Sequence, residues 1–167
     1  VVDKTGTLTK GKPELVSLNN LSDKSDADIA AIMASLDNKS GHPIAHAVVS
    51  YAREKNIPLL PVEQFEALKG KGVVGTVGGT EYHVGSAKLT RELGGEFSSL
   101  EDETREGKTP VILSLGGKVL AVALVADAIK SEAVQAVKDL HALGISVVML
   151  TGDDRNTARF IASQVGI

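Results

Sequence analysis

The sequence predicts an α/β domain that is interrupted by an inserted α+β domain. In the last third, a helical pattern ends at Gly144 and is followed by the nearly continuous apolar run Ile145–Leu150, a loop and a second helical pattern. This order of strand, loop and helix is typical of a parallel α/β unit. In the middle, short apolar runs are joined by glycine pairs, which indicate antiparallel hairpins.

The insertion is predicted to contain two helices and two hairpins. A first helix is expected around residues 29–36, and a second begins at Pro43, which suits the first turn of a helix. Hairpins are expected at residues 72–84 and 111–125, each with a glycine pair at its turn. The polar segment 89–106 between them is expected to be helical. The apolar stripes of the two helices are Ile29, Ile32, Met33 and Leu36, and Ile44, Ala47, Val48 and Tyr51.

The α/β part is predicted to hold two helices around one strand. Ser131 is expected to cap a helix that runs through Leu143, because a hydroxyl at a helix start can accept a backbone N–H. The run Ile145–Leu150 is expected to be a strand that is buried on both faces of a parallel sheet. A further helix is expected from about Asn156 to Val165.

The domain boundaries follow from these elements. Residues 1–13 and 123–167 are predicted to form the α/β part, and residues 14–122 are predicted to form the insertion. The chain starts at Val1 in an apolar strand, without an initiator Met, and stops at Ile167 just after a helix. We therefore expect an excised fragment of a longer protein.

Composition argues against nucleic acid as a partner. Aromatic residues make up only 3% of the chain and the formal net charge is −3, so there are few stacking platforms and no attraction for phosphate backbones. The apolar runs have strand length, far below the roughly 20 residues that span a bilayer. Because cysteine is absent, disulfides and thiolate metal sites are excluded. We expect a soluble, monomeric fragment.

The segment Asp3–Thr9 reads Asp-Lys-Thr-Gly-Thr-Leu-Thr and carries the strongest chemical signal. It places a carboxylate at the carboxyl end of a short apolar strand, the edge at which parallel sheets bind ligands. Asp3 is therefore predicted to be a nucleophile for a phosphoryl group, with Lys4 bringing positive charge close by. A single Asp also fits an ordinary turn, but the unbroken heptapeptide favours catalysis. Phosphoryl transfer to a carboxylate also requires Mg²⁺.

This heptapeptide resembles the phosphorylation motif of P-type ATPases, within the haloacid dehalogenase-like superfamily. The resemblance implies that Asp3 takes phosphate from ATP and that Asp3 and the backbone carbonyl of Thr5 hold Mg²⁺. Phosphatases of the superfamily usually carry a second Asp where Thr5 stands, so Thr5 favours a pump. Thr151-Gly152-Asp153 resembles the phosphate-binding motif of the family, and Asp127 with Lys130 resembles its motif at the hinge between domains.

The middle of the chain resembles the heavy-metal-transporting subfamily of these ATPases. Ser40-Gly41-His42-Pro43 is similar to its Ser-Glu-His-Pro motif, which implies that His42 orients the adenine of ATP. Gly70 and Gly72 resemble the glycine loop opposite this histidine. Gly85 matches a further glycine of the nucleotide pocket.

Three positions depart from the pattern of this subfamily. Asp37 and Gly41 stand where Glu is common, and Ser86 stands where Asn is common. The Gly-Asp-Gly-x-Asn-Asp segment of the family, which supplies a further carboxylate for Mg²⁺, and a preceding lysine are expected beyond Ile167. We therefore expect this chain to bind ATP without turning it over. The nucleotide-binding residues implied by the resemblance are Asp37, His42, Gly70, Gly72, Gly85 and Ser86.

The predicted function is ATP binding and, in the intact pump, transfer of the γ-phosphate to Asp3 to drive transport of a heavy-metal ion, such as copper or zinc. The ligands of that ion would belong to membrane segments, so the ion itself is not predicted, and this fragment would lie on the cytosolic face of the membrane. The alternatives are a phosphatase of the same superfamily and a non-catalytic nucleotide-binding module. ATP and Mg²⁺ are the expected ligands, and the expected catalytic residues are Asp3, Lys4, Thr5, Thr151, Gly152 and Asp153.

Overall fold

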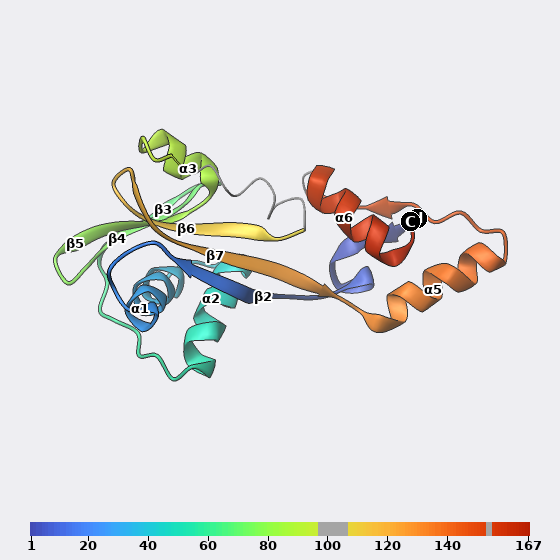
Figure 1. Cartoon of the computed structure of the whole chain (residues 1–167), viewed down its shortest axis with the longest axis horizontal. Coiled ribbons are helices and arrows are strands. Elements are labelled where there is room, and N and C mark those ends of the chain that lie inside the picture. The colour runs from blue at the N-terminus through green and yellow to red at the C-terminus, as the bar shows by residue number, and fades with distance from the viewer. Residues whose placement is uncertain (97–106, 153–154) are drawn as a thin grey trace.

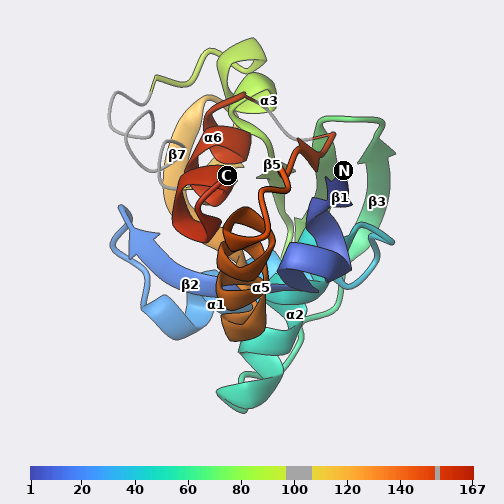
Figure 2. The same cartoon turned by 90° about the vertical axis from the view of Figure 1, so that its right-hand side faces the viewer.

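The chain forms two lobes of unequal size that are joined by a pair of long strands (Figure 1). The structure is a computed structural model that describes residues 1–96, 107–152 and 155–167. The large lobe contains a six-stranded sheet, and the small lobe contains a two-stranded one. Both ends of the chain lie in the small lobe, which faces the viewer in Figure 2.

The sheet of the large lobe is antiparallel throughout and has the strand order β2-β7-β6-β5-β4-β3. Neighbouring strands in its second half follow each other in sequence, so the two predicted hairpins, β4 with β5 and β6 with β7, are confirmed. The strands are β2 (Thr9–Asn20), β3 (Glu63–Leu68), β4 (Gly72–Val77), β5 (Thr80–Gly85), β6 (Thr109–Leu115) and β7 (Lys118–Ile129).

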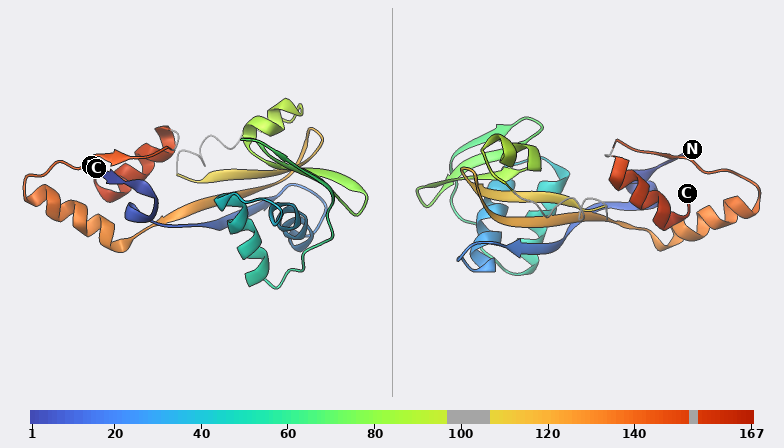
Figure 3. Two further views of the ribbon diagram at one scale, coloured as in Figure 1. Left: turned by 180° about the vertical axis from the view of Figure 1, so that it is seen from behind. Right: turned by 45° about the horizontal axis from the view of Figure 1, so that its top comes forward.

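Helices cover both faces of this sheet. The helices α1 (Asp26–Asp37) and α2 (Pro43–Glu54) lie on one face, and the short helix α3 (Ala87–Glu92) lies on the other (Figures 1 and 3). The predicted apolar stripe of α1 is buried, since Ile29, Met33 and Leu36 have no exposed surface. These side chains pack with the inward residues of β4 to β7 and form the main core.

The small lobe is built from the two ends of the chain. Strand β1 (Val2–Asp3) pairs in parallel with β8 (Met149–Leu150), and the turn η1 (Lys4–Leu8) leads from β1 into β2. Helices α5 (Ser131–Ala142) and α6 (Arg155–Val165) complete the lobe. A separate small core joins these elements and centres on Leu8, Ala133, Val137 and Val165.

The strands β2 and β7 belong to the sheet of the large lobe and also lead into the small lobe (Figure 3). They pair over most of their length, from Asn20 opposite Ala121 to Thr9 opposite Ile129. The register of β2 on β7 is irregular between Thr9 and Pro13, in the part of the pair that lies next to the small lobe. The two chain crossings between the lobes therefore lie side by side.

Three predictions of local structure need correction. The run Ile145–Leu150 is a strand only at Met149–Leu150, and Val148 and Leu150 are exposed, because within the described residues β8 pairs with β1 alone and has one covered face. Helix α5 has Lys130 at its N-cap position, with no side-chain cap, and the hydroxyl of Ser131 donates instead to Glu132. Of the segment 89–106, which was predicted to be helical, the described residues are helical only as far as Glu92, in α3, and residues 97–106 lie outside the described residues.

We expect the large lobe to depend on the centre of β6. Leu113 is fully buried in the main core, whereas Leu115 on the same strand is 40% exposed. Leu113→Ala should therefore lower the free energy of unfolding by about 2–5 kcal/mol, and Leu115→Ala should cost clearly less. Urea unfolding followed by circular dichroism measures both variants. Equal losses for the two would contradict this description of the core.

Candidate functional site

The carboxyl ends of β1 and β8 bring two predicted catalytic segments to the same sheet edge. Asp3 is paired with Leu150 in the parallel register, so Thr151 follows directly on the neighbouring strand. Asp3 is exposed, and Thr151 is half-buried. Gly152 is exposed, and a Cβ added to it would meet no atom within 4 Å. Asp153 lies outside the described residues.

The turn η1 after Asp3 is held by the chain segment at the end of β7. Gly6 has a φ of 78°, a conformation that favours glycine. Its carbonyl oxygen accepts a hydrogen bond from Nζ of Lys130 at 2.6 Å, and the backbone N–H of Lys130 donates to the carbonyl oxygen of Leu8 at 2.9 Å. Thr5 has an extended backbone within this turn and an exposed side chain. Lys130, which resembles a hinge residue in sequence, therefore contacts the loop that follows Asp3.

A second contact links the same two segments. Thr9 is fully buried, and its hydroxyl lies 2.6 Å from Oδ2 of Asp127 and 3.1 Å from the carbonyl oxygen of Lys4. Oδ1 of Asp127 is buried and has no hydrogen-bond partner among the described residues. The sequence analysis missed the role of Thr9, although its place at the end of the heptapeptide was a signal. A pocket of about 240 Å³ lies here and is lined by Lys4, Thr5, Thr9, Asp127, Thr157 and neighbouring residues.

A larger pocket of about 400 Å³ lies in the large lobe. Every residue that the sequence analysis assigned to nucleotide binding lines it: Asp37, His42, Gly70, Gly72, Gly85 and Ser86. These residues come from the end of α1, the start of α2, the β3–β4 connection and the end of β5. The remaining wall is mostly apolar. Lining residues that were not predicted to bind nucleotide include Ile44, Leu68, Val84, Thr109 and Pro110.

Asp37 is the buried acidic group of this pocket. It is 5% exposed, and its Oδ2 has no hydrogen-bond partner among the residues that the structure describes. Burial raises the pKa of its carboxyl from an ordinary value of 3.8 to about 7, because the charged form loses its hydration. A ligand that offers a hydrogen-bond donor would satisfy this oxygen.

His42 has two roles in the structure of the pocket. It is the N-cap of α2, and its Nδ1 accepts the backbone N–H of Ile44 at 3.2 Å. When the ring is neutral, the proton therefore lies on Nε2, which is left as a donor. Pro43 follows at the first helical position, where its missing N–H costs nothing. The motif thus fixes the orientation of an exposed ring that lines the pocket.

Two glycines allow the strands of the pocket wall to approach closely. Gly72 and Gly85 are register partners on β4 and β5. A Cβ added to Gly72 would lie 2.2 Å from the carbonyl oxygen of Val84, and one added to Gly85 would lie 2.3 Å from that of Lys71. Gly72 also has a φ of 151°, which other residues rarely adopt. The close packing of this wall therefore requires glycine at both positions.

The two pockets are neighbours. Ile44 and Thr109 line both of them, so the larger pocket adjoins the one that contains Lys4 and Thr5. A ligand that fills the larger pocket can therefore extend toward the loop that follows Asp3.

Comparisons with known proteins place this arrangement in a family. A family model described as haloacid dehalogenase-like hydrolase matches residues 1–167. The chain belongs to this family. A Copper-exporting P-type ATPase of Legionella pneumophila subsp. pneumophila is 42% identical over 171 residues, which cover 100% of this chain and 23% of that protein. Relatives of this haloacid dehalogenase-like chain thus include copper and other heavy-metal P-type ATPases.

Solved structures agree with this placement. A zinc-transporting PIB-type ATPase in its E2.Pi state has a TM-score of 0.82 and 28% identity, covering 99% of this chain and 27% of that one. The N-domain of a copper-transporting P-type ATPase shares the fold, with a TM-score of 0.56 and 21% identity, over 68% of this chain and 98% of that one. The chain spans about a fifth to a quarter of the length of the curated relatives it matches.

Two features are absent from the ranges 1–96, 107–152 and 155–167. None of their helices combines the length and the apolar character that crossing a membrane requires. They also contain no group of three or more acidic or histidine side chains that is placed to hold a metal ion.

The raised pKa of Asp37 should make stability depend on pH. Between the ordinary pKa of 3.8 and the folded value of about 7, the folded protein keeps a proton that the unfolded chain has released. The free energy of unfolding should therefore fall as pH rises through this window, by at most ~4 kcal/mol. In the Asp37→Asn variant, whose side chain is neutral at every pH, the free energy of unfolding should not show this decrease. Urea unfolding across the window tests it, and a constant difference between variant and wild type would contradict it.

Proposed function

We propose that this chain is the ATP-binding and phosphorylation part of a heavy-metal P-type ATPase. It binds ATP in the larger pocket and, in the intact pump, its Asp3 receives the γ-phosphate. The observation that carries the proposal is that one pocket is lined by all the residues that the sequence assigned to nucleotide binding, although they come from four segments of the chain. The match to P-type ATPases over the whole chain supports it.

The chemistry of the larger pocket suits an adenine ring. Its apolar wall and few polar groups are typical of sites for small organic ligands. The exocyclic amine of adenine is a donor for the unpartnered Oδ2 of Asp37. Nε2 of His42 offers a donor, and its exposed ring offers a flat face for stacking. We therefore assign the base of ATP to this end of the site.

The neighbouring pocket suits the phosphate end. Lys4 and Thr5 line it, and it adjoins the larger pocket through Ile44 and Thr109. Asp3 is the residue before this loop, and its exposed carboxylate is accessible to an incoming phosphoryl group. The nucleophile attacks the γ-phosphorus while ADP leaves, and the hydroxyl of Thr5 and the segment Thr151-Gly152 are assigned to the phosphate oxygens.

Two oxygen donors next to the smaller pocket are of the kind that binds Mg²⁺. The exposed carboxylate of Asp3 and the main-chain oxygen of Thr5 are hard oxygen donors, the kind that Mg²⁺ prefers, and phosphate oxygens and water are its usual further ligands. When bound, Mg²⁺ would neutralise the charge of the phosphate that approaches the carboxylate.

The rest of the proposal concerns the intact protein. We assign residues 1–13 and 123–167 to the phosphorylation domain and residues 14–122 to the nucleotide-binding domain. Thr5 replaces the acid that helps phosphatases of the superfamily hydrolyse the aspartyl phosphate, which favours an intermediate that lasts long enough to drive transport. The transported heavy-metal ion binds to membrane segments, and this monomeric part lies on the cytosolic face.

The first test concerns Asp3. In the full-length pump, Asp3→Asn should abolish acid-stable, hydroxylamine-sensitive labelling by γ-labelled ATP, because the amide cannot form an acyl phosphate. Asp23→Asn, which changes an exposed loop carboxylate, is the matched control and should label like wild type. Labelling that persists in the Asp3 variant would overturn the assignment.

The second test separates the two roles of His42. His42→Asn keeps an acceptor for the N-cap of α2 but removes the ring, so ATP affinity should fall about ten-fold while the free energy of unfolding stays near that of wild type. His42→Ala should lose both the ring and the N-cap acceptor. Its ATP affinity should fall as in His42→Asn, and its free energy of unfolding should fall in addition by about 1 kcal/mol. Calorimetric titration and urea unfolding measure the two effects.

His46→Ala is the control for this test, because His46 is an exposed histidine of α2 that does not line the pocket. Unchanged ATP affinity in both His42 variants would mean that the base binds elsewhere.

A further inference from the structure

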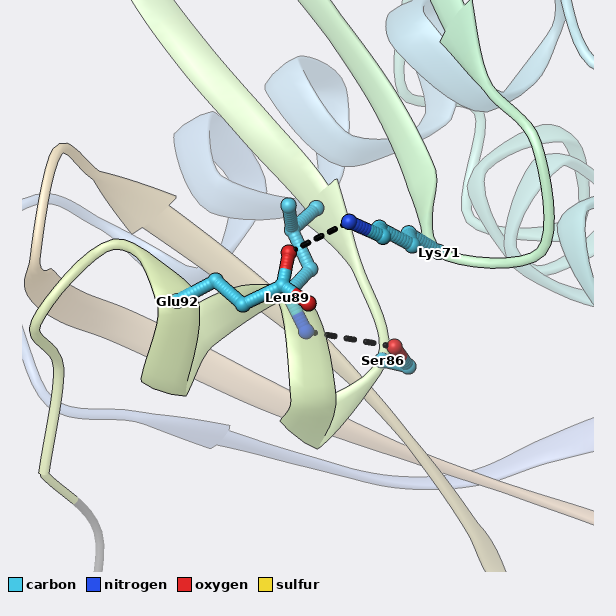
Figure 4. Close-up of polar contacts among 4 residues, drawn as sticks. All are labelled: Lys71, Ser86, Leu89 and Glu92. Atoms are coloured by element: carbon cyan, nitrogen blue, oxygen red, sulfur yellow. Dashed lines mark hydrogen bonds and ion pairs between the residues drawn. The ribbon is translucent and has the colours of Figure 1, made fainter.

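A side-chain pair joins the β3–β4 connection to helix α3. Nζ of Lys71 lies 2.6 Å from Oε2 of Glu92 (Figure 4). Both side chains are partly exposed, at 38% and 42%. The hydrogen bond from Lys71 is also the main reason why the pKa of Glu92 lies below its ordinary value. Lys71 belongs to the glycine loop of the larger pocket, whereas Glu92 does not line that pocket.

The main chain of Lys71 is bound to the same region of the protein. Its carbonyl oxygen accepts the backbone N–H of Ser86 at 2.8 Å. Ser86 is in turn the N-cap of α3, where its hydroxyl accepts the N–H of Leu89 at 3.4 Å. Figure 4 shows the Ser86–Leu89 hydrogen bond together with the ion pair of Lys71 and Glu92. Lys71 is therefore attached to the β5–α3 connection through its main chain and, through its ammonium group, to the last turn of α3.

The turn around Lys71 is also held by the main chain, because the N–H of Lys71 donates to the carbonyl oxygen of Leu68 at 2.9 Å and Gly72 pairs with Leu68 and with Gly85. Gly70 and Gly72 flank Lys71, with φ values of 70° and 151°, and glycine changes conformation at low cost. Gly72 and Gly85 are register partners on β4 and β5, and the absence of side chains there permits a close approach of the two strands. The bond from Lys71 to Glu92 adds a side-chain link between this turn, which lines one wall of the pocket, and helix α3.

We propose that Lys71 and Glu92 form a clamp that sets the width of the larger pocket and thereby the affinity for adenine nucleotides. This inference rests on the proposed function of that pocket. Both are positioning residues, because Glu92 lies outside the pocket and the ammonium group of Lys71 is directed toward α3 (Figure 4). A direct contact between Lys71 and phosphate is a different role, and the test below separates the two.

The clamp is tested by binding of adenosine and of ATP to this chain. Lys71→Met and Glu92→Gln should each lower the affinity for adenosine and the affinity for ATP by the same factor, about two- to five-fold, as expected for the loss of a partly exposed ion pair. The double variant with exchanged charges, Lys71→Glu with Glu92→Lys, should restore the affinity for adenosine, which is uncharged. Lys55→Met and Glu81→Gln, which alter exposed charges outside the pocket, should bind like wild type.

The salt dependence of adenosine affinity distinguishes loss of the ion pair from a general loss of stability. Because salt screens exposed ion pairs, raising its concentration should weaken adenosine binding to wild type and leave binding to the two single variants unchanged. Hydrogen exchange of the amides of residues 69–72, measured without ligand, should become faster in both single variants.

The outcomes distinguish the possible failures. If Lys71→Met weakens ATP but not adenosine, or if Glu92→Gln strengthens ATP binding, Lys71 is a phosphate ligand and the clamp is wrong. Unchanged exchange of residues 69–72 would also overturn it. If wild type binds neither adenosine nor ATP, the proposed function fails, and the clamp fails with it as a determinant of affinity.

Discussion

The pairing of β2 with β7 is the constraint on which the rest of the structure depends. These strands close one side of the large sheet and also form the two crossings between the lobes. At the end of the pair, the buried hydroxyl of Thr9 lies beside Asp127, and Lys130 holds the turn after Asp3. The candidate nucleophile therefore takes its position relative to the larger pocket from one antiparallel ladder and the few polar contacts at its end.

The two lobes divide the chemistry between them. The large lobe provides an apolar pocket with one buried acid and one oriented histidine, and the small lobe provides an exposed carboxylate at a sheet edge. Two buried carboxylate oxygens have no partner in the described chain, one on Asp37 and one on Asp127. Leaving such an atom unpaired costs about 1–3 kcal/mol, so stability alone does not explain either one. Asp37, at the larger pocket, is thus a group whose partner a ligand can supply.

The sequence predicted the helices and the hairpins because each has a local signature. The stripe of α1, the glycine pairs of the turns and Pro43 after His42 depend on neighbouring residues only. The residues proposed to bind nucleotide all line one pocket, but their role stays a prediction. Contacts between distant segments could not be predicted in this way. Thr9 and Asp127 are 118 positions apart in the sequence. Because the register of β2 on β7 is irregular near Thr9, a regular pairing of the two strands would not predict that these residues are in contact.

Strand burial shows the same limit. An apolar run such as Ile145–Leu150 has the same composition whether one or both of its faces are covered. In the structure, Val147 and Met149 pack inward and Val148 and Leu150 are exposed, which only the set of neighbouring elements decides. The cap of α5 moved by one residue from Ser131 to Lys130 for a similar reason, since side-chain preference at a helix start is a weak guide to its exact position.

The glycine pair on β4 and β5 has a consequence for how this protein can diverge. When two side chains collide, a smaller partner can relieve the collision, and the two positions can change together over time. At Gly72 and Gly85 the nearest obstacle to a new side chain is a main-chain oxygen, which no substitution can shorten. A compensating mutation at the opposite position is therefore unavailable to either glycine, and each is restricted independently of what the other becomes.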